Sequence, residues 1–171
     1  RSLKKRFTGD IRFSKSIDKG KTFSLPQTVN DNRDMISHRF DTLGVSRKGD
    51  VYISWLDKRD RQQAELAGTK YNGAAAYFAV SVDGGNNYRP NIKIADNSCE
   101  CCRMAMDFDQ LDLPVITWMN FYGDNIRDHS IVSFKNSLTP RNPDRLSHNN
   151  WKLDGCPHHG PSLSISDSNI Y

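Results

Sequence analysis

Three of the chain's four cysteines lie within four positions, in the stretch NSCECCRMAM at residues 97–106. They are Cys99, Cys101 and Cys102, and the fourth cysteine is Cys156, in the stretch GCPHHGP. Thiolates and imidazoles bind soft metal ions, and pairs of thiols form disulfides or take part in redox chemistry. These residues therefore predict a disulfide bridge, a metal centre or a redox-active thiol.

An even number of cysteines favours the disulfide, with Cys156 bridged to one member of the 99–102 group. Adjacent Cys101 and Cys102 are not expected to pair with each other, because the ring they would close is strained. The sequence alone does not choose among the remaining pairings.

A metal site is the second interpretation, in which cysteines and histidines would bind copper or zinc. Met104 and Met106 offer additional thioether sulfurs. In the third interpretation, Arg103 lowers the pKa of a neighbouring cysteine and makes its thiol redox-active.

An internal repeat indicates which elements must position these residues. The segments SIDKGKTF at 16–23 and SVDGGNNY at 81–88 share the pattern S-x-D-x-G-x-x-aromatic. Each follows a strand-like run and precedes a return segment that contains proline. In each we expect the aspartate to accept backbone hydrogen bonds in a tight turn, with glycine supplying the permissive backbone. A degenerate third copy is expected near 133–137.

A second pair of segments repeats with nearly the same period. RFDTLGVSRKGDVYISW and RMAMDFDQLDLPVITW both have the pattern of strand, turn and strand. They begin at Arg39 and Arg103 and end at Trp55 and Trp118, so the period is about 64 residues. No long segment has helical periodicity, and four short strands per repeat are typical of a propeller blade. The fold class is therefore all-β, a β-propeller of four-stranded antiparallel blades.

The two S-x-D-x-G-x-x-aromatic segments and the strand GDVYISWLDKRD between them resemble the Asp-box repeats of the sialidase superfamily, whose members are six-bladed β-propellers. The resemblance implies that residues 1–171 form a partial propeller of about three blades. The remaining blades, or a partner chain, would close the ring. The resemblance also implies a secreted or periplasmic location, where disulfides are stable.

The repeat predicts that the cysteines and several histidines share the mouth of the central channel. His38, Cys102 and His158 occupy equivalent positions at the start of successive inner strands, and Arg39, Arg103 and His159 follow them. The full set expected at this mouth is Cys99, Cys101, Cys102, Cys156, His38, His158 and His159.

Two functions follow from the resemblance. In the first, the chain is a binding or accessory module for a glycan or another anionic ligand, and Arg39 and Arg103 hold that ligand. In the second, it is an exo-sialidase-type hydrolase in which arginines clamp a substrate carboxylate and Asp57 is the acid/base. The family's Arg-Ile-Pro motif is absent, and no Tyr–Glu nucleophile pair can be placed.

Charge and hydropathy exclude two kinds of partner, nucleic acid and the interior of a membrane. The net charge is +4, and it is not gathered on one segment, so nucleic acid is not expected. No apolar run is long enough for a membrane span. We expect the chain to be part of a longer protein, because SLSISDSNIY ends within a strand-like run. The stretch 60–69, DRQQAELAGT, is expected to form a polar loop between two strands of a blade.

Overall fold

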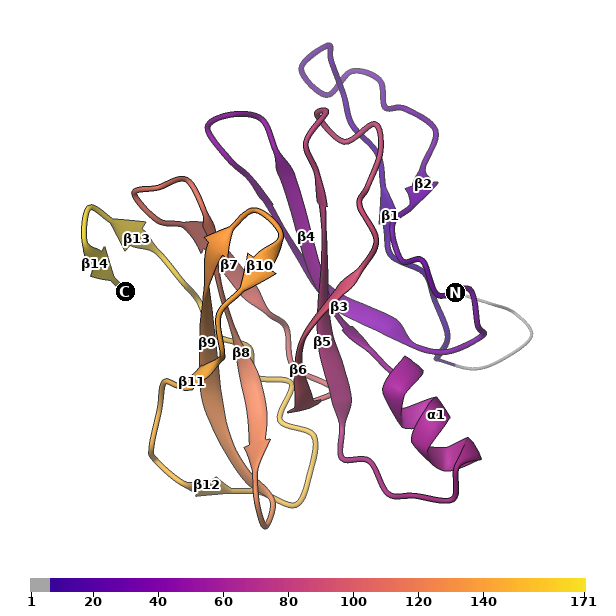
Figure 1. Ribbon diagram of the computed structural model, residues 1–171, viewed down its shortest axis with the longest axis vertical. Helices are drawn as coiled ribbons and strands as arrows, with labels where there is room; N and C mark the ends of the chain where they lie inside the picture. Colours follow the sequence, from indigo (N-terminus) through magenta and orange to yellow (C-terminus); the bar gives the residue numbers. More distant parts are fainter. Residues whose placement is uncertain (1–6) are drawn as a thin grey trace.

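The computed structural model describes residues 7–171 and is dominated by antiparallel strands (Figure 1). In chain order its elements are β1 (Arg12–Phe13), β2 (Gln27–Thr28), β3 (His38–Val45), β4 (Val51–Asp57), α1 (Arg59–Leu66), β5 (Ala74–Ser81), β6 (Ile92–Ser98), β7 (Ala105–Phe108), β8 (Pro114–Tyr122), β9 (Ile126–Asn136), β10 (Thr139–Pro140), β11 (Asp144–Arg145), β12 (Trp151–Lys152), β13 (Ile165–Ser166) and β14 (Asn169–Ile170).

The strands form two adjacent blades. β3, β4, β5 and β6 pair in that order, and β7, β8 and β9 form the second blade, whose outer edge carries the short strands β10, β11 and β12. A single pair, Ser98 opposite Asn120, joins the two blades within one sheet. The separate hairpins β1–β2 and β13–β14 flank this unit. The prediction of an all-β partial propeller is confirmed.

The two blades pack face to face, with their inner strands next to each other. At Gly44 in β3, an added Cβ atom would lie only 2.8 Å from the Met106 Sδ atom of β7. β13 continues the series, because the backbone N–H of Ile165 donates to the Asp107 carboxylate of β7 over 2.6 Å. The inner strands β3, β7 and β13 are therefore successive neighbours.

The middle strands are buried on both faces, which explains their nearly continuous apolar sequence. On β4, Trp55 packs against the β1–β2 unit, whereas Tyr52 packs against the second blade. On β5, all eight positions are buried. Cores therefore lie both between the β1–β2 unit and the first blade and between the two blades, as expected for blades stacked around an axis.

The tryptophan repeat has a structural basis. Trp55 donates its indole N–H to Asp57 over 2.9 Å, and Trp118 donates to Asn120 over 3.3 Å. Both tryptophans are almost fully buried at equivalent places in β4 and β8. A buried indole N–H needs an acceptor, and the residue two positions along the strand supplies it in both blades.

The two S-x-D-x-G segments form the same hydrogen-bonded turn. In the first, the backbone N–H of Gly20 donates to the Ser16 hydroxyl and that of Thr22 donates to Asp18. In the second, Gly85 and Asn87 donate to Ser81 and Asp83 in the same way. Both turns lie at the end of the blades opposite to α1 (Figure 1).

The residues of the expected third copy have a different arrangement. Ser133 and Lys135 lie within β9, and Ser137 is in the turn that leads to β10. Where the sequence lacks the aspartate, the chain forms a plain hairpin in place of the hydrogen-bonded turn.

The first of these turns gives a pH prediction. Hydrogen bonds from Ser16, then from Thr22, lower the pKa of Asp18 to about 2. A carboxylate in the unfolded chain has a pKa of about 3.9, so this turn contributes stability above that pH and loses the contribution as the pH falls through about 2. We expect the Asp18 carboxyl carbon to titrate near pH 2 by NMR. Titration near pH 4 would contradict the hydrogen-bonded turn.

Residues 60–69 do not form the predicted loop, because most of them belong to α1. Gln, Ala, Glu and Leu are good helix formers, and Arg61 pairs with Glu65 one turn later over 3.0 Å. No residue of α1 is buried, so the helix has no apolar face and leaves no periodic pattern in the sequence.

Since one short helix cannot cross a bilayer, no helix within residues 7–171 spans a membrane.

Candidate functional site

A cavity of about 770 Å³ opens where the inner strands begin. It brings together six residues that the sequence places at the channel mouth, namely His38, Arg39, Cys101, Arg103, Cys156 and His158. Asp10, Asp41, Lys58 and Phe40 also line it. The repeat therefore predicts which segments meet here, although they are separated by up to 120 residues in the chain (158 − 38).

Arg39 and His38 both line this cavity and both carry a buried ring or guanidinium nitrogen without a hydrogen-bond partner, and Arg39 is the one of the two with a permanent charge. Its guanidinium lies 4.8 Å from the centre of the Phe40 ring, so one face of its plane is covered by an aromatic side chain. The Nε atom is buried and has no hydrogen-bond partner. Leaving a buried charged donor unsatisfied costs free energy, which makes the Arg39 guanidinium a candidate for binding an anion in the cavity.

Two histidines predicted at the mouth hold structural positions. His38 is buried, with Nδ1 2.9 Å from the Gly9 carbonyl oxygen and Nε2 3.5 Å from Asp57. His159 does not line the cavity, and its ring packs against Trp151 in an edge-to-face contact. His158 does line the cavity, where its ring lies 6.5 Å from that of Phe40.

Asp57 does not line the cavity and is fully buried. Its carboxylate accepts the Trp55 indole N–H, the Arg59 backbone N–H and the Arg59 guanidinium, at 2.8–2.9 Å. Both oxygens are therefore occupied, and the residue does not face the cavity. This network fits a structural role better than that of an acid/base.

The cysteines divide into one bridge and two thiols. Cys101 and Cys156 form a disulfide across 55 residues, with Cα atoms 6.1 Å apart, so the expected bridge between Cys156 and the 99–102 group is confirmed. Cys99 and Cys102 are buried free thiols. Cys101 is bonded to the distant Cys156 and not to its neighbour Cys102, as the strain argument predicts.

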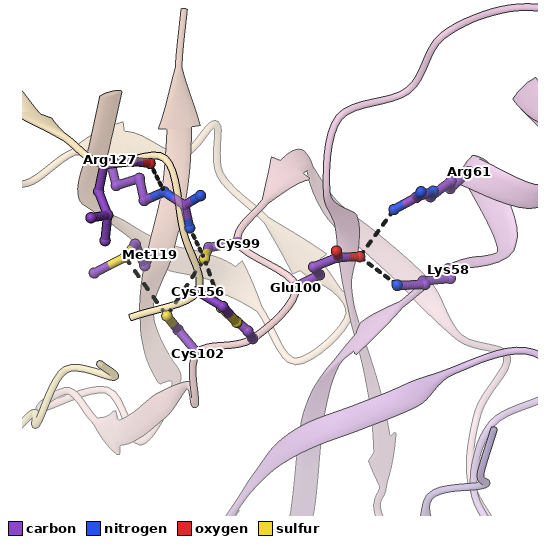
Figure 2. Close-up of a disulfide and its surroundings, with 10 residues drawn as sticks. Lys58, Arg61, Cys99, Glu100, Cys102, Met119, Arg127 and Cys156 are labelled. Atoms are coloured by element: carbon purple, nitrogen blue, oxygen red, sulfur yellow. Dashed lines mark hydrogen bonds and ion pairs between the residues drawn. A yellow bond between two sulfur atoms is a disulfide. The ribbon is translucent and has the colours of Figure 1, made fainter. Parts of the chain in front are cut away.

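The turn that carries these cysteines is held from three sides (Figure 2). The Cys99 backbone N–H donates to the Met119 carbonyl oxygen of β8 over 2.9 Å. Glu100 forms ion pairs with Lys58 and Arg61, next to and within α1. The disulfide at Cys101 supplies the third attachment, so the turn is fixed between both blades and the loop that follows β12.

The free sulfurs form a compact group with Met119. The Sγ atoms of Cys99 and Cys102 are 3.5 Å apart, and Cys102 Sγ lies 3.7 Å from Met119 Sδ. Arg127 Nη1 donates to Cys99 Sγ over 3.1 Å, while its Nε donates to the Leu153 carbonyl oxygen. The Arg127 guanidinium also covers the Phe121 ring at 4.6 Å.

This environment separates the two thiols chemically. The hydrogen bond from Cys102 lowers the pKa of the Cys99 thiol, and Arg127 adds to the shift, although burial opposes it. The same pairing, together with burial, raises the pKa of Cys102. One sulfur is thus stabilised as a thiolate beside a protonated neighbour. Arg127, and not the predicted Arg103, is the arginine that acts on a cysteine.

The sequence interpretation missed Arg127 and Met119. Met104 and Met106, the thioethers it named as possible additional ligands, belong to or pack against the core between the blades. Among residues 7–171, the cluster of side chains able to hold a metal ion contains Cys99, Cys101 and Cys102 and no histidine. The position of Arg127 at the start of β9, beside the cysteine turn, follows from strand register and leaves no local pattern.

Comparisons with known proteins agree with the fold. No protein-family model and no curated protein matches the chain. Among solved structures, the Hadza microbial sialidase Hz136 is similar, with a TM-score of 0.55 and 17% sequence identity. The match covers 80% of this chain and 31% of that one, so the chain spans about a third of the sialidase's length. The fold is sialidase-like.

Proposed function

We propose that this chain is part of an extracytoplasmic sialidase-like propeller that binds an acidic glycan in the cavity at the channel mouth. The observation that carries the proposal is the buried, unpartnered Nε of Arg39 in the cavity wall, with Arg103 on the same wall. A planar guanidinium binds a carboxylate through two parallel hydrogen bonds, which suits a sugar acid.

The other side chains of the cavity fit a sugar better than a small inorganic anion. Asp10 and Asp41 offer carboxylate oxygens that accept hydrogen bonds from hydroxyl groups. Phe40 offers an apolar ring for the carbon face of a pyranose. The disulfide between Cys101 and Cys156 forms part of the wall and supports an oxidising location.

The proposal includes further blades that close the ring around residues 1–171, supplied by a longer chain or by a partner. The two S-x-D-x-G turns support assignment to the Asp-box repeats, because each aspartate carries the same hydrogen bonds. The chain covers 31% of the similar sialidase, which leaves room for such blades.

Calorimetric titration with N-acetylneuraminic acid tests the binding function. We expect Arg39→Ala and Arg103→Ala each to weaken binding by roughly tenfold or more, since a hydrogen bond to a charged group contributes about 1.5–3 kcal/mol. Arg89→Ala is the matched control, because Arg89 is exposed and adjoins the turn at 81–88. The methyl ester of the sugar, which lacks the carboxylate charge, should bind weakly to every variant. Equal affinity for acid and ester would overturn the proposal.

The hydrolase alternative is tested separately with a fluorogenic sialoside. Asp57 is the acid/base in the hydrolase alternative, and its burial favours binding of the glycan without hydrolysis. Release of the fluorophore that disappears in Arg103→Ala would favour the hydrolase instead.

A further inference from the structure

We propose that Cys99, Cys102 and Met119 form a binding site for a single Cu(I) ion, separate from the glycan cavity that the Cys101–Cys156 disulfide lines. The site is independent of the proposed glycan binding, because none of its three sulfur ligands lines that cavity. It rests on the spacing, burial and chemistry of the three sulfur atoms.

Cys102 Sγ lies at nearly the spacing of ligands around one ion from both of the other sulfur atoms. Two of the three separations are 3.5 and 3.7 Å. Metal–sulfur bonds of about 2.3 Å, as found for zinc thiolates, place two sulfurs of one ion roughly 3.8–4.0 Å apart in tetrahedral or trigonal geometry. The ion would therefore need only small movements of side chains that are already in contact.

The donor set selects Cu(I) over Zn(II). Thiolates and thioethers are soft ligands that favour Cu(I), whereas structural zinc is almost always four-coordinate. The disulfide removes Cys101 and Cys156 as donors, which leaves two thiols and one thioether. Within residues 7–171 no histidine or carboxylate joins the cysteine cluster as a fourth ligand.

Charge balance also favours a monovalent ion. Two thiolates and one Cu(I) carry a net charge of −1, and the Arg127 guanidinium, 3.1 Å from Cys99 Sγ, brings the total to zero. A buried site with no net charge avoids most of the desolvation penalty. On loading, the two thiols release two protons, the copper remains Cu(I), and no oxidant or reductant is required.

Burial would protect the bound ion. Cys99, Cys102 and Met119 are each 1% exposed. The Cys101–Cys156 bridge lines the cavity, whereas Cys99, Cys102 and Met119 do not. The loop that carries Cys156 packs closely over this region, because an added Cβ at Gly160 would lie 2.8 Å from the Arg103 carbonyl oxygen. Water and oxygen are therefore kept from the sulfur cluster.

The test is an anaerobic titration of the disulfide-intact chain with Cu(I) against a colorimetric Cu(I) chelator. We expect one Cu(I) per chain, an X-ray absorption spectrum with sulfur as the only nearest neighbour, and loss of both reactive thiols in a thiol count. Cys99→Ser and Cys102→Ser should abolish competition with the chelator. Met119→Leu, which conserves volume, should weaken binding by roughly tenfold or more.

Matched variants separate metal binding from folding. Met104→Leu replaces a buried thioether outside the cluster and should leave Cu(I) affinity unchanged. Arg127→Gln should weaken Cu(I) binding by roughly 10–100-fold, as for a group that orients a metal ligand. Near-ultraviolet circular dichroism identifies the folded variants. Unchanged Cu(I) binding in folded Met119→Leu, or a second disulfide between Cys99 and Cys102 in the isolated chain with no copper uptake, would overturn the proposal.

Discussion

Removal of the Cys101–Cys156 bridge is expected to lower the free energy of unfolding by roughly 4 kcal/mol. The bridge closes a loop of 55 residues, and the entropy that it removes from the unfolded chain grows with the logarithm of that length. For a chain of this size the melting temperature should fall by about 10 °C. The variant to measure is the double serine variant at both positions, by thermal unfolding under non-reducing conditions.

The double variant is preferable to Cys156→Ser alone. Cys99 Sγ lies 3.6 Å from Cys101 Sγ, so a freed Cys101 has a new partner within reach. Reduction of the native chain should produce the same loss of stability, and reductant should leave the double variant unchanged. A double variant that melts at the native temperature would show that the bridge does not constrain the fold.

The bridge also has a consequence for ligand binding. It holds the loop that carries Cys156 and His158 against the cavity wall. Without it, that loop is attached only through weaker contacts, and the cavity loses one side. We therefore expect the double serine variant to bind N-acetylneuraminic acid more weakly than the native chain at a temperature where both are folded.

The repeat explains how much of this arrangement can be predicted from sequence. A period of about 64 residues places the starts of the inner strands in register, so the sequence predicts that Arg39, Arg103 and His158 lie together. The tryptophans mark the same phase because each needs an acceptor two residues later. These features depend on local pattern and on the order of strands, both of which the sequence contains.

The sulfur cluster depends on contacts that local pattern does not contain. Cys101 is the partner of Cys156 because of the path of the loop after β12, which has no regular structure between residues 153 and 164. Met119 and Arg127 reach the cysteines because β8 and β9 pair in one particular register, with Phe121 opposite Arg127. A shift by one residue would turn Arg127 to the other face of the sheet.

Replacement of Asp57 by asparagine is expected to cost roughly 3 kcal/mol of stability, because breaking a buried ion pair leaves a charge without its partner. The Arg59 side chain is 14% exposed and donates to Asp57 over 2.8 Å. Its second acceptor, Asp31, is 2.7 Å away and half-exposed, which keeps the loss at the lower end of the range for such pairs. Denaturant unfolding with an unchanged m-value measures the effect.

Asp31→Asn is the matched control, since it removes the other carboxylate from the same arginine. An exposed ion pair contributes about 0–1 kcal/mol, so this variant should unfold close to the native midpoint. The position equivalent to Asp57 in the second blade supports a larger structural role for Asp57 than for Asp31. There Asn120 is enough to accept the Trp118 N–H, and Tyr122 stands where Arg59 stands in the first blade.

The Asp57→Asn substitution also tests whether Asp57 has a structural or a catalytic role. Asp57 carries no contact to the cavity, so folded Asp57→Asn should bind N-acetylneuraminic acid as the native chain does, and only its stability should fall. Asp41 lines the cavity, and Asp41→Asn should show the reverse, with weaker binding and little change in stability. If Asp57→Asn instead kept its stability and lost turnover of a fluorogenic sialoside, the buried carboxylate would be acting on substrate, and the assignment of binding without hydrolysis would be wrong.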